Sequence, residues 1–279
     1  MKKIGTGAAY AAAAIICLAI LSPVLLLLDL SFQDETELAK AFVPMNGNGF
    51  SMPDLLPLFP TFDNFKEILL FSPQFYTVFW NSMTIAAAVT VGQLLIAVPA
   101  AWAFSQFGSG FKRQLFDLYV LLMLMPFQVT MLSQYILLDR TGLMNTRCAI
   151  ILPAVFSAFP VFIIYRSFSS IPKEILEAAR IDGAGELHIL FHIGLPAGSS
   201  GIMAAMVLGF LELWNMVEQP LAFIKDHRLY PLSLYLPALG RQGGNILAAS
   251  VVTLIPAAFV FLTGQEQLEA GIIASAIKE

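Results

Sequence analysis

Three histidines are the first side chains to weigh for chemistry, because imidazole is a common metal ligand. His188 and His192 lie four residues apart, a spacing that places them on one face of a helix, while His227 is remote in sequence. A zinc site needs at least a third ligand beside such a pair, and none is evident. The two cysteines, Cys17 and Cys148, fall in apolar runs and build neither a disulfide framework nor a metal site. We therefore expect no bound metal.

Nucleotide chemistry has no support in this chain either. Residues 108–113 read Gly-Ser-Gly-Phe-Lys-Arg, which does not fit the phosphate-binding pattern G-x-x-x-x-G-K-[ST]. No Ser-His-Asp arrangement has local support. We expect no catalytic residue and no cofactor held by the chain itself.

The composition is that of a membrane protein. Apolar residues make up 58% and charged residues 12% of the 279 residues, and the mean hydropathy is +0.77. Ordinary soluble domains have about 45–50% apolar and about 25% charged residues. The net charge of -4 and the lack of a basic patch exclude a nucleic-acid partner. A chain that faces lipid needs few charges, so a bilayer is the expected surrounding.

Runs with little or no charge predict the membrane spans. A helix of about 20 apolar residues crosses a bilayer core, and prolines are tolerated in such helices. The first run follows Lys2 and Lys3 and is longer than the core of a signal peptide, so we interpret it as a retained anchor with a cytoplasmic N-terminus. Six spans then return the C-terminus to the cytoplasm. The predicted fold is all-α, with helices near residues 5–29, 80–105, 115–138, 148–167, 197–219 and 246–265.

Polar side chains within these spans are candidates for a solute path, because polar groups at membrane depth usually face the bundle or a wet cavity. Hydrogen bonding between helices is the competing interpretation. The spans carry almost no charge, which argues against proton or sodium coupling and favours a neutral polar solute. The candidates, with one aromatic that could stack on a sugar ring, are Gln93, Gln128, Ser133, Gln134, Trp214, Asn215 and Glu218.

The segment between the fourth and fifth spans predicts a short amphipathic helix. Ser170 is a suitable N-cap, Pro172 suits the first turn and Glu174 complements the helix dipole there. Gly183 supplies the left-handed residue that ends many helices. A second helical stretch is expected from Glu186 to Ile193. Two adjacent small residues, at 178 and 179, would let another protein's backbone approach closely.

This segment resembles the EAA loop of binding-protein-dependent permeases of ATP-binding-cassette (ABC) importers. Glu177-Ala178-Ala179, Gly183 and Ile193-x-Leu195-Pro196 meet every fixed position of the pattern EAA-x3-G-x9-I-x-L-P. Other stretches are similar to the carbohydrate-uptake branch of the family, and Trp214-Asn215 resembles the fifth-helix end of maltose-transporter G-type subunits. That branch often has Trp-Asn-Glu, whereas Met216 follows Asn215 here and the nearest acid is Glu218.

The resemblance implies a type I importer permease fold in which the loop is cytoplasmic and docks into an ATP-hydrolysing subunit. It implies a second permease subunit, a dimer of ATP-binding subunits that hold ATP and magnesium, and an extracytoplasmic solute-binding protein. The implied mechanism is alternating access. By the same resemblance, the coupling contact to the ATPase would be made by Glu177, Ala178, Ala179, Arg180, Asp182 and Gly183.

The expected organisation follows from the spans and the loop. Residues 1–30 form an N-terminal membrane helix, 31–78 an extracytoplasmic segment, 79–265 a five-helix core with the coupling loop at 169–196, and 266–279 a cytoplasmic tail. A secondary transporter and a membrane-embedded enzyme or assembly factor are the alternatives. Uptake that fails without an ATPase partner would separate the first interpretation from both. The sequence leaves the solute open among oligosaccharides, monosaccharides, polyols and glycerol phosphate.

Overall fold

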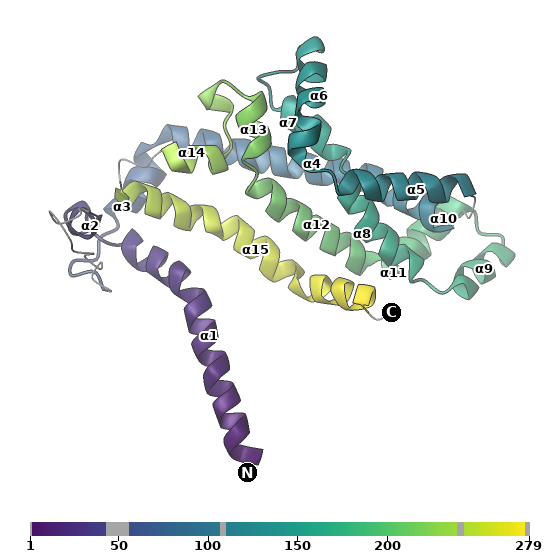
Figure 1. Ribbon diagram of the computed structural model, residues 1–279, viewed down its shortest axis with the longest axis horizontal. Helices are drawn as coiled ribbons and strands as arrows, with labels where there is room; N and C mark the ends of the chain where they lie inside the picture. The colour runs from purple at the N-terminus through teal and green to yellow at the C-terminus, as the bar shows by residue number, and fades with distance from the viewer. Residues whose placement is uncertain (1, 43–55, 107–109, 239–242, 277–279) are drawn as a thin grey trace. The chain divides into compact units, whose positions relative to one another are not determined.

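The computed structural model describes residues 2–42, 56–106, 110–238 and 243–276. Every regular element within these ranges is helical, as the sequence predicted (Figure 1). The chain divides into two compact units, Met1–Tyr76 with Tyr235–Ile255, and Thr77–Leu234 with Pro256–Glu279. Part of the predicted extracytoplasmic segment, 43–55, and the last three residues of the predicted tail lie outside the described residues.

The first unit is organised around the end of its long N-terminal helix. The side-chain amide of Asn64 donates hydrogen bonds to the backbone oxygens of Ser31 and Gln33 at 3.3 and 2.9 Å. Phe32 packs edge-on against Phe62, with ring centroids 5.3 Å apart. The elements that begin in this unit are α1 (Lys2–Ser31), α2 (Glu35–Phe42), α3 (Asp63–Lys66), the π-helical η1 (Glu67–Phe71), α4 (Pro73–Gln106) and α15 (Gly243–Ala276).

The second unit contains most of α4, the second half of α15 and the elements between them as far as Leu234, so that α14 is divided between the two units. α8 packs closely along α12, and α5 packs on α8. Within this unit α15 approaches α12 at Gly264, where an added Cβ would meet the side chain of Val207. The remaining elements are α5 (Gly110–Met123), α6 (Phe127–Arg140), α7 (Cys148–Val155), α8 (Ala158–Ser169), α9 (Lys173–Ile181), α10 (Glu186–Ile189), η2 (Leu190–Gly194), α11 (Leu195–Ala197), α12 (Ser199–Trp214), α13 (Glu218–Phe223), η3 (His227–Leu229) and α14 (Leu232–Ala238).

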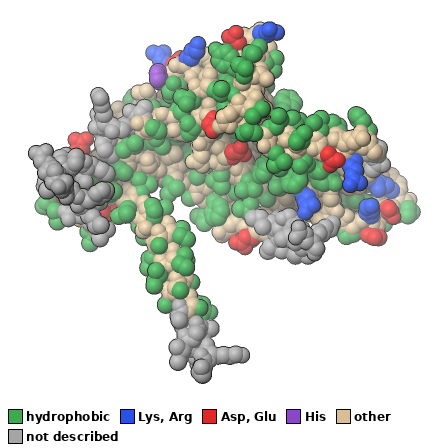
Figure 2. All heavy atoms as spheres, viewed as in Figure 1, with side chains coloured by type: hydrophobic (Ala, Val, Ile, Leu, Met, Phe, Trp, Pro, Cys, Tyr) green, Lys and Arg blue, Asp and Glu red, His purple; other side chains and the backbone are tan. Residues whose placement is uncertain are grey.

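Four helices are long and apolar enough to cross a membrane, and two bent pairs bring the number to six if each pair counts as one span. The four are Ala9–Ser31 in α1, Pro73–Gln106 (α4), Cys148–Ser169, which covers α7 and α8 together, and Gly244–Glu269 in α15. Apolar side chains cover the visible surface of α1 and much of α15 (Figure 2). These helices match four of the predicted spans and extend several of them.

The predicted helix over 115–138 is wrong as a single element. α5 ends at Met123 and α6 begins at Phe127, with a bend of 99° between them. Pro126 explains the break, because it lacks a backbone N–H, disfavours helical geometry in the residue before it and adopts an extended ψ of 147°. Pro23, Pro99 and Pro256, in contrast, lie inside long helices.

A second bend, of 70°, separates Glu186–Ala197 from α12. At its other end, the predicted span over 197–219 stops earlier than expected, at Trp214, and α13 begins separately at Glu218. Asn215 is the C-cap of α12, and its side-chain amide donates to the backbone oxygen of Leu211 at 2.9 Å. This side chain thus helps to end the helix that the sequence analysis extended beyond it.

Candidate functional site: the anchored helix α9

The loop after α8 contains the predicted amphipathic helix, α9, but it begins differently from the expectation. Ser170 is not its N-cap: it is the C-cap of α8, and its hydroxyl donates to the Ser167 carbonyl at 2.7 Å. Pro172 takes the N-cap position with an extended ψ of 131°, and Glu174 stands in the first turn. The missing N–H of proline costs nothing there, because a helix leaves its first N–H groups unpaired in any case. Three residues therefore separate the end of α8 from the start of α9.

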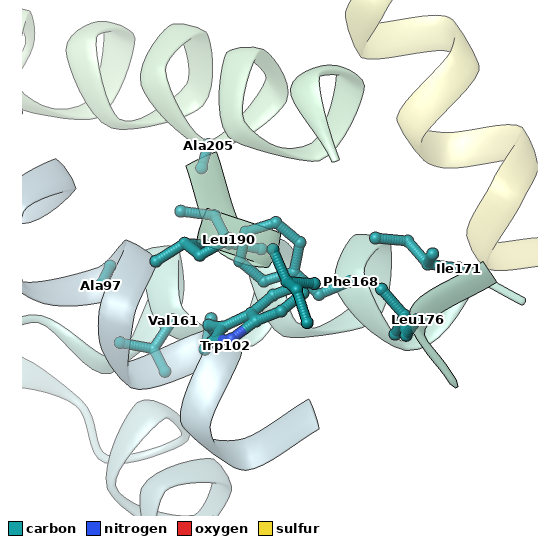
Figure 3. Packing of buried hydrophobic residues seen from close by; sticks show 11 residues of the cluster. Ala97, Trp102, Val161, Phe168, Ile171, Leu176, Leu190 and Ala205 are labelled. Carbon is teal, nitrogen blue, oxygen red and sulfur yellow. The ribbon is translucent and has the colours of Figure 1, made fainter. Parts of the chain in front are cut away.

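One side chain anchors α9 to the helices around it. Leu176 is only 2% exposed and packs in a cluster that also contains Ile171, Phe168 and Trp102. Figure 3 shows these side chains converging from the α9 region, α8 and α4. Trp102 meets Phe168 edge-on, with centroids 5.2 Å apart and planes at 90°, an arrangement that aromatic pairs favour. A displacement of α9 therefore presses directly on α4 and α8.

The outer side of α9 exposes both apolar and polar groups. Glu177 and Ala178 are exposed, Ile175 is half exposed and Ile181 is 87% exposed. The expectation that Ala178 and Ala179 share one outward face is wrong, because Ala179 is partly buried against the core cluster. The outer side of α9 therefore combines exposed apolar side chains with exposed charged ones.

Gly183 ends α9 in the way that the sequence predicted. Its φ is +82°, a value that L side chains rarely adopt. Its N–H donates to the Arg180 carbonyl at 3.1 Å, and the N–H of Ala184 donates to the Ala179 carbonyl at 3.0 Å. These two bonds form a Schellman motif, which pairs the last carbonyls of the helix. The turn fixes the direction in which α10 leaves α9.

Gly183→Ala tests this turn. No atom lies within 4 Å of an added Cβ, so we expect only the conformational cost of a left-handed alanine, about 1–2 kcal/mol. The purified protein should unfold at a lower temperature, and the loop should become more sensitive to protease. Gly185→Ala is the matched control, since an added Cβ there also meets nothing and the φ of Gly185 is −73°. Equal effects of the two changes would contradict a role for the left-handed turn.

Arg180 ties the loop together. Its Nε donates to Glu186 Oε1 at 2.8 Å, and its Nη2 lies 3.3 Å from Gln106 Oε1 at the end of α4. The hydrogen bond from Arg180 to Glu186 raises the pKa of the guanidinium above its ordinary value, so Arg180 stays charged. Arg180 thereby joins α9, α10 and α4.

The turn borders a surface depression of about 540 Å³. The rings of His188 and His192 stack there, with centroids 3.9 Å apart and planes at 17°. Asp182 is exposed at the same depression. No group of three or more His, Cys, Asp or Glu side chains suited to a metal occurs among the residues that the structure describes. The residues that line the depression are Ala179, Asp182, Gly183, Ala184, Gly185, His188, His192 and Ile193.

Two of the predicted solute-path residues are packing residues. Gln93 is buried in α4 and donates to the Ala154 carbonyl at 3.0 Å, which is the helix–helix bond of the competing interpretation. Trp214 is 4% exposed, stacks on Phe210 at 5.5 Å and meets Phe79 edge-on at 6.0 Å. Within this chain neither side chain offers a surface to a solute.

The other candidates lie on α6 and around the start of α13. Gln128 Nε2 donates to Glu218 Oε1 at 2.9 Å, so the structure brings these two together across 90 residues of sequence. Gln134 donates to Thr130 at 3.3 Å on the same helix, and Ser133 is exposed beside it. Asn215 is exposed but engaged with Leu211. Among the predicted solute-path residues, only Gln128 and Glu218 are joined to each other as an exposed polar pair.

Sequence reasoning missed several residues of the site. Leu176 was not singled out as the anchor, although it follows Pro172 by one turn in an amphipathic pattern that could have shown it. Gln106 and Trp102 were not connected with the loop, because their contacts with it span roughly 70 residues. Short-range periodicity carries no signal for such contacts.

Apolar helices of membrane-spanning length, with a short amphipathic helix anchored beside them by a buried leucine, define a helical membrane protein. The chain belongs to the family described as "Binding-protein-dependent transport system inner membrane component", which it matches over residues 93–272. The match includes the whole of α9 and its turn.

Curated relatives agree with the family. The chain is 31% identical to the arabinooligosaccharides transport system permease protein AraQ of Halalkalibacterium halodurans, over 92% of this chain and 90% of that protein. It is 30% identical to the lactose transport system permease protein LacG of Rhizobium radiobacter, over 71% and 74% of the two chains. The sn-glycerol-3-phosphate permease protein UgpE of Pectobacterium atrosepticum is 27% identical over 70% of this chain and 72% of that protein.

A solved structure shows the same fold. It is a bacterial ABC transporter involved in the import of the acidic polysaccharide alginate, matched with a TM-score of 0.79 and 21% identity over 95% of this chain and 96% of that chain. A second structure, of the alginate transporter in complex with a pentasaccharide-bound periplasmic protein, matches with a TM-score of 0.67 and 16% identity over 95% and 94%. The predicted ABC importer permease fold is confirmed.

Proposed function

We propose that this chain is the permease subunit of an ATP-driven importer that moves a carbohydrate or a similar polar solute by alternating access. The observation that carries the proposal is α9, which is anchored inward by Leu176 and exposes Ala178 and Ile181 outward. A helix held in this way transmits a push from a partner to the helices beneath it. In the proposed mechanism, ATPase subunits close on ATP, α9 moves with them, and α4 and α8 respond through the shared core cluster.

The relatives support the solute class. Two of the most similar relatives carry names for arabinooligosaccharides and lactose. The apolar spans hold few ionisable groups, so a neutral polar solute fits them better than an ion. The exposed Gln128–Glu218 pair supplies hydrogen-bond donors and acceptors of the kind that hydroxyl groups require. The carboxylate also disfavours an anionic solute at that place.

The proposal includes partners and an orientation. ATP and magnesium bind to a dimer of ATPase subunits that contacts Glu177, Ala178 and the Gly183 turn, so this chain itself performs no hydrolysis. A second permease subunit completes the pore, and a binding protein delivers the solute to outer segments that include 31–78. Both termini lie in the cytoplasm, on the same side as α9.

Ala178→Trp tests the docking of the ATPase. Ala178 is exposed, so the larger side chain leaves the fold intact but separates the two proteins by the width of an indole. We expect ATPase activity stimulated by loaded binding protein to fall at least about tenfold, the result of losing about 1.4 kcal/mol of interaction. The measurement is stimulated ATP hydrolysis by the purified complex in lipid nanodiscs.

Ala13→Trp is the matched control, because it makes the same change at an exposed position of α1. ATP hydrolysis by the Ala13→Trp complex should be stimulated by loaded binding protein as strongly as in the parent. Unchanged stimulation in the Ala178→Trp complex would contradict the docking role of α9. Uptake into vesicles that lack any ATPase subunit would instead favour the alternative, a secondary transporter.

A further inference from the structure

Helix α4 carries an amide side chain at each of three levels, and each reaches a different part of the second unit. Asn81 bonds to the segment 223–232, Gln93 to the end of α7 and Gln106 to the coupling loop. The first and last are 25 positions apart on a continuous helix, which is about 38 Å at 1.5 Å per residue. The bonds at Asn81 and Gln106 therefore lie at opposite ends of one apolar span.

The Gln106 end receives the coupling loop. Gln106 Oε1 accepts from Arg180 Nη2 at 3.3 Å, while Glu186 accepts from Arg180 Nε at 2.8 Å and from the same Nη2 at 3.5 Å. Gln106 is further fixed by a bond from its Nε2 to the Ser105 hydroxyl at 3.2 Å. Because Arg180 is on α9 itself, this hydrogen bond links α9 to α4 directly, in addition to their contact through the apolar cluster.

The Asn81 end holds a segment without a long helix. Asn81 is 0% exposed. Its Nδ2 donates to the carbonyls of Arg228 at 2.7 Å and Tyr230 at 3.2 Å, and its Oδ1 accepts from Arg147 Nη2 at 2.7 Å. The next residue, Ser82, accepts from the Leu232 N–H at 2.8 Å. Two consecutive side chains of α4 thus pair three backbone groups of one segment.

The loop before α7 supports the same segment from a second side. Asn145 adopts a φ of +59°, and its Oδ1 accepts from the N–H groups of Lys225 and Asp226, both at 2.8 Å. Its own N–H donates to the Phe223 carbonyl at 2.9 Å. Blue and purple side chains gather over the outer part of this segment in Figure 2, between α13 and α14 of Figure 1. The charged residues there are exposed, but their backbone is firmly held.

Between its two ends α4 is packed along one face. The buried positions recur at helical spacing and are Asn81, Ser82, Ile85, Ala86, Val89, Gln93, Ala97, Ala101 and Trp102. The Gln93 bond to the Ala154 carbonyl fixes the register of α4 against α7 midway. A buried amide that slides away from its partner leaves a polar group unpaired, which costs about 1–3 kcal/mol. The helix therefore moves as a unit with its end contacts.

We propose that α4 is a tie, meaning a rigid link between the two ends of the span. Gln106 takes up the displacement of α9 through its hydrogen bond with Arg180, and Asn81 passes the displacement on to the segment 223–232. Gln106 and Asn81 are positioning residues, since neither touches the solute or the nucleotide. This inference rests on the proposed function, because it assumes that an ATPase displaces α9. It adds a route by which the opposite end of the span senses the nucleotide state.

Hydrogen exchange of the segment 223–232 tests the tie. The full complex with its ATPase and second permease, in nanodiscs, is compared with and without ATP and vanadate. In the parent we expect the exchange of the Lys225, Asp226 and Leu232 amides to change about fivefold on nucleotide binding, a typical size for coupling between sites. Gln106→Ala should reduce this change, because only the apolar cluster around Leu176 then links α9 to α4, and it should leave nucleotide-free exchange as in the parent. Transport per ATP hydrolysed should fall about fivefold as well.

Two further variants give the test its specificity. Gln106→Glu keeps an acceptor for Arg180 and should retain the nucleotide-dependent change. Gln114→Ala, at an exposed glutamine of α5, is the matched control and should behave like the parent. At the other end of α4, Asn81→Asp keeps the acceptor for Arg147 but loses the hydrogen bonds donated to the Arg228 and Tyr230 carbonyls. Hydrogen exchange of the segment 223–232 should therefore rise both with and without nucleotide.

The outcomes separate the tie from the proposed function. A Gln106→Ala complex that keeps the full nucleotide-dependent change would overturn the tie, as would a parent whose 223–232 exchange ignores nucleotide. In both cases the proposed function would still stand if loaded binding protein stimulates the ATPase activity of the complex. A parent complex without such stimulation would overturn both proposals.

Discussion

Leu176→Asp should abolish coupled transport by detaching α9 from the core. The side chain is 2% exposed and surrounded by apolar groups, and loss of a buried leucine alone costs about 2–5 kcal/mol. A buried carboxylate adds the cost of desolvating a charge without a partner. Since each 1.4 kcal/mol is a factor of ten, we expect uptake to fall at least about 100-fold in reconstituted vesicles. Limited proteolysis within the loop should also become faster.

Ile175→Asp separates anchoring from docking. Ile175 is the residue before the anchor but is half exposed, so a carboxylate there remains in water and the loop keeps its protease resistance. If the ATPase covers this surface, its affinity for the permease falls while the fold of the loop does not change. Normal uptake by the Leu176→Asp variant, or equal protease sensitivity of the two variants, would contradict the assignment of Leu176 as the anchor.

The local features of the loop could be predicted because their causes are local. Gly183 ends α9 since the left-handed turn depends on one residue's backbone, and the apolar spacing around Leu176 is a property of nine consecutive residues. The membrane helices follow in the same way from runs of apolar residues. The boundary at Ser170 was wrong because Pro172, two positions later, competes for the same N-cap place.

The tertiary contacts could not be predicted, because periodicity says which residues are buried but not what buries them. Gln93 and Trp214 were both candidates for a solute path, yet Gln93 bonds to the end of α7 and Trp214 packs against Phe79 of α4. Asn81 is not among the residues that the sequence singles out, although it joins segments separated by about 150 residues. The bend at Pro126 depends on whether neighbouring helices can satisfy the freed carbonyls, which one sequence alone does not reveal.

Gly201→Ala is expected to destabilise the packing of α8 on α12 in the second unit. Gly201 lies on α12 where it crosses α8, and an added Cβ would meet the Cβ of Ser167 and lie 2.8 Å from its Oγ. Small residues at such crossings let membrane helices approach closely. Overpacking costs about 1–3 kcal/mol, so we expect the thermal midpoint of the purified protein to fall by about 5 °C. Because Ser169 ends α8 only four positions before Lys173 begins α9, displaced α8 also misplaces the coupling helix.

The double variant Gly201→Ala with Ser167→Gly identifies the cause. Removing the serine side chain vacates the space that the new methyl group occupies, so the pair should recover most of the lost thermal stability. Recovery stays incomplete, since Ser167 Oγ donates to the Gly198 carbonyl at 3.3 Å and that bond is lost. If the thermal midpoint of the double variant fell by the sum of the two single losses, α8 and α12 would not meet at these residues. Coupled uptake should recover together with stability, because the same crossing sets the direction in which α8 leads into α9.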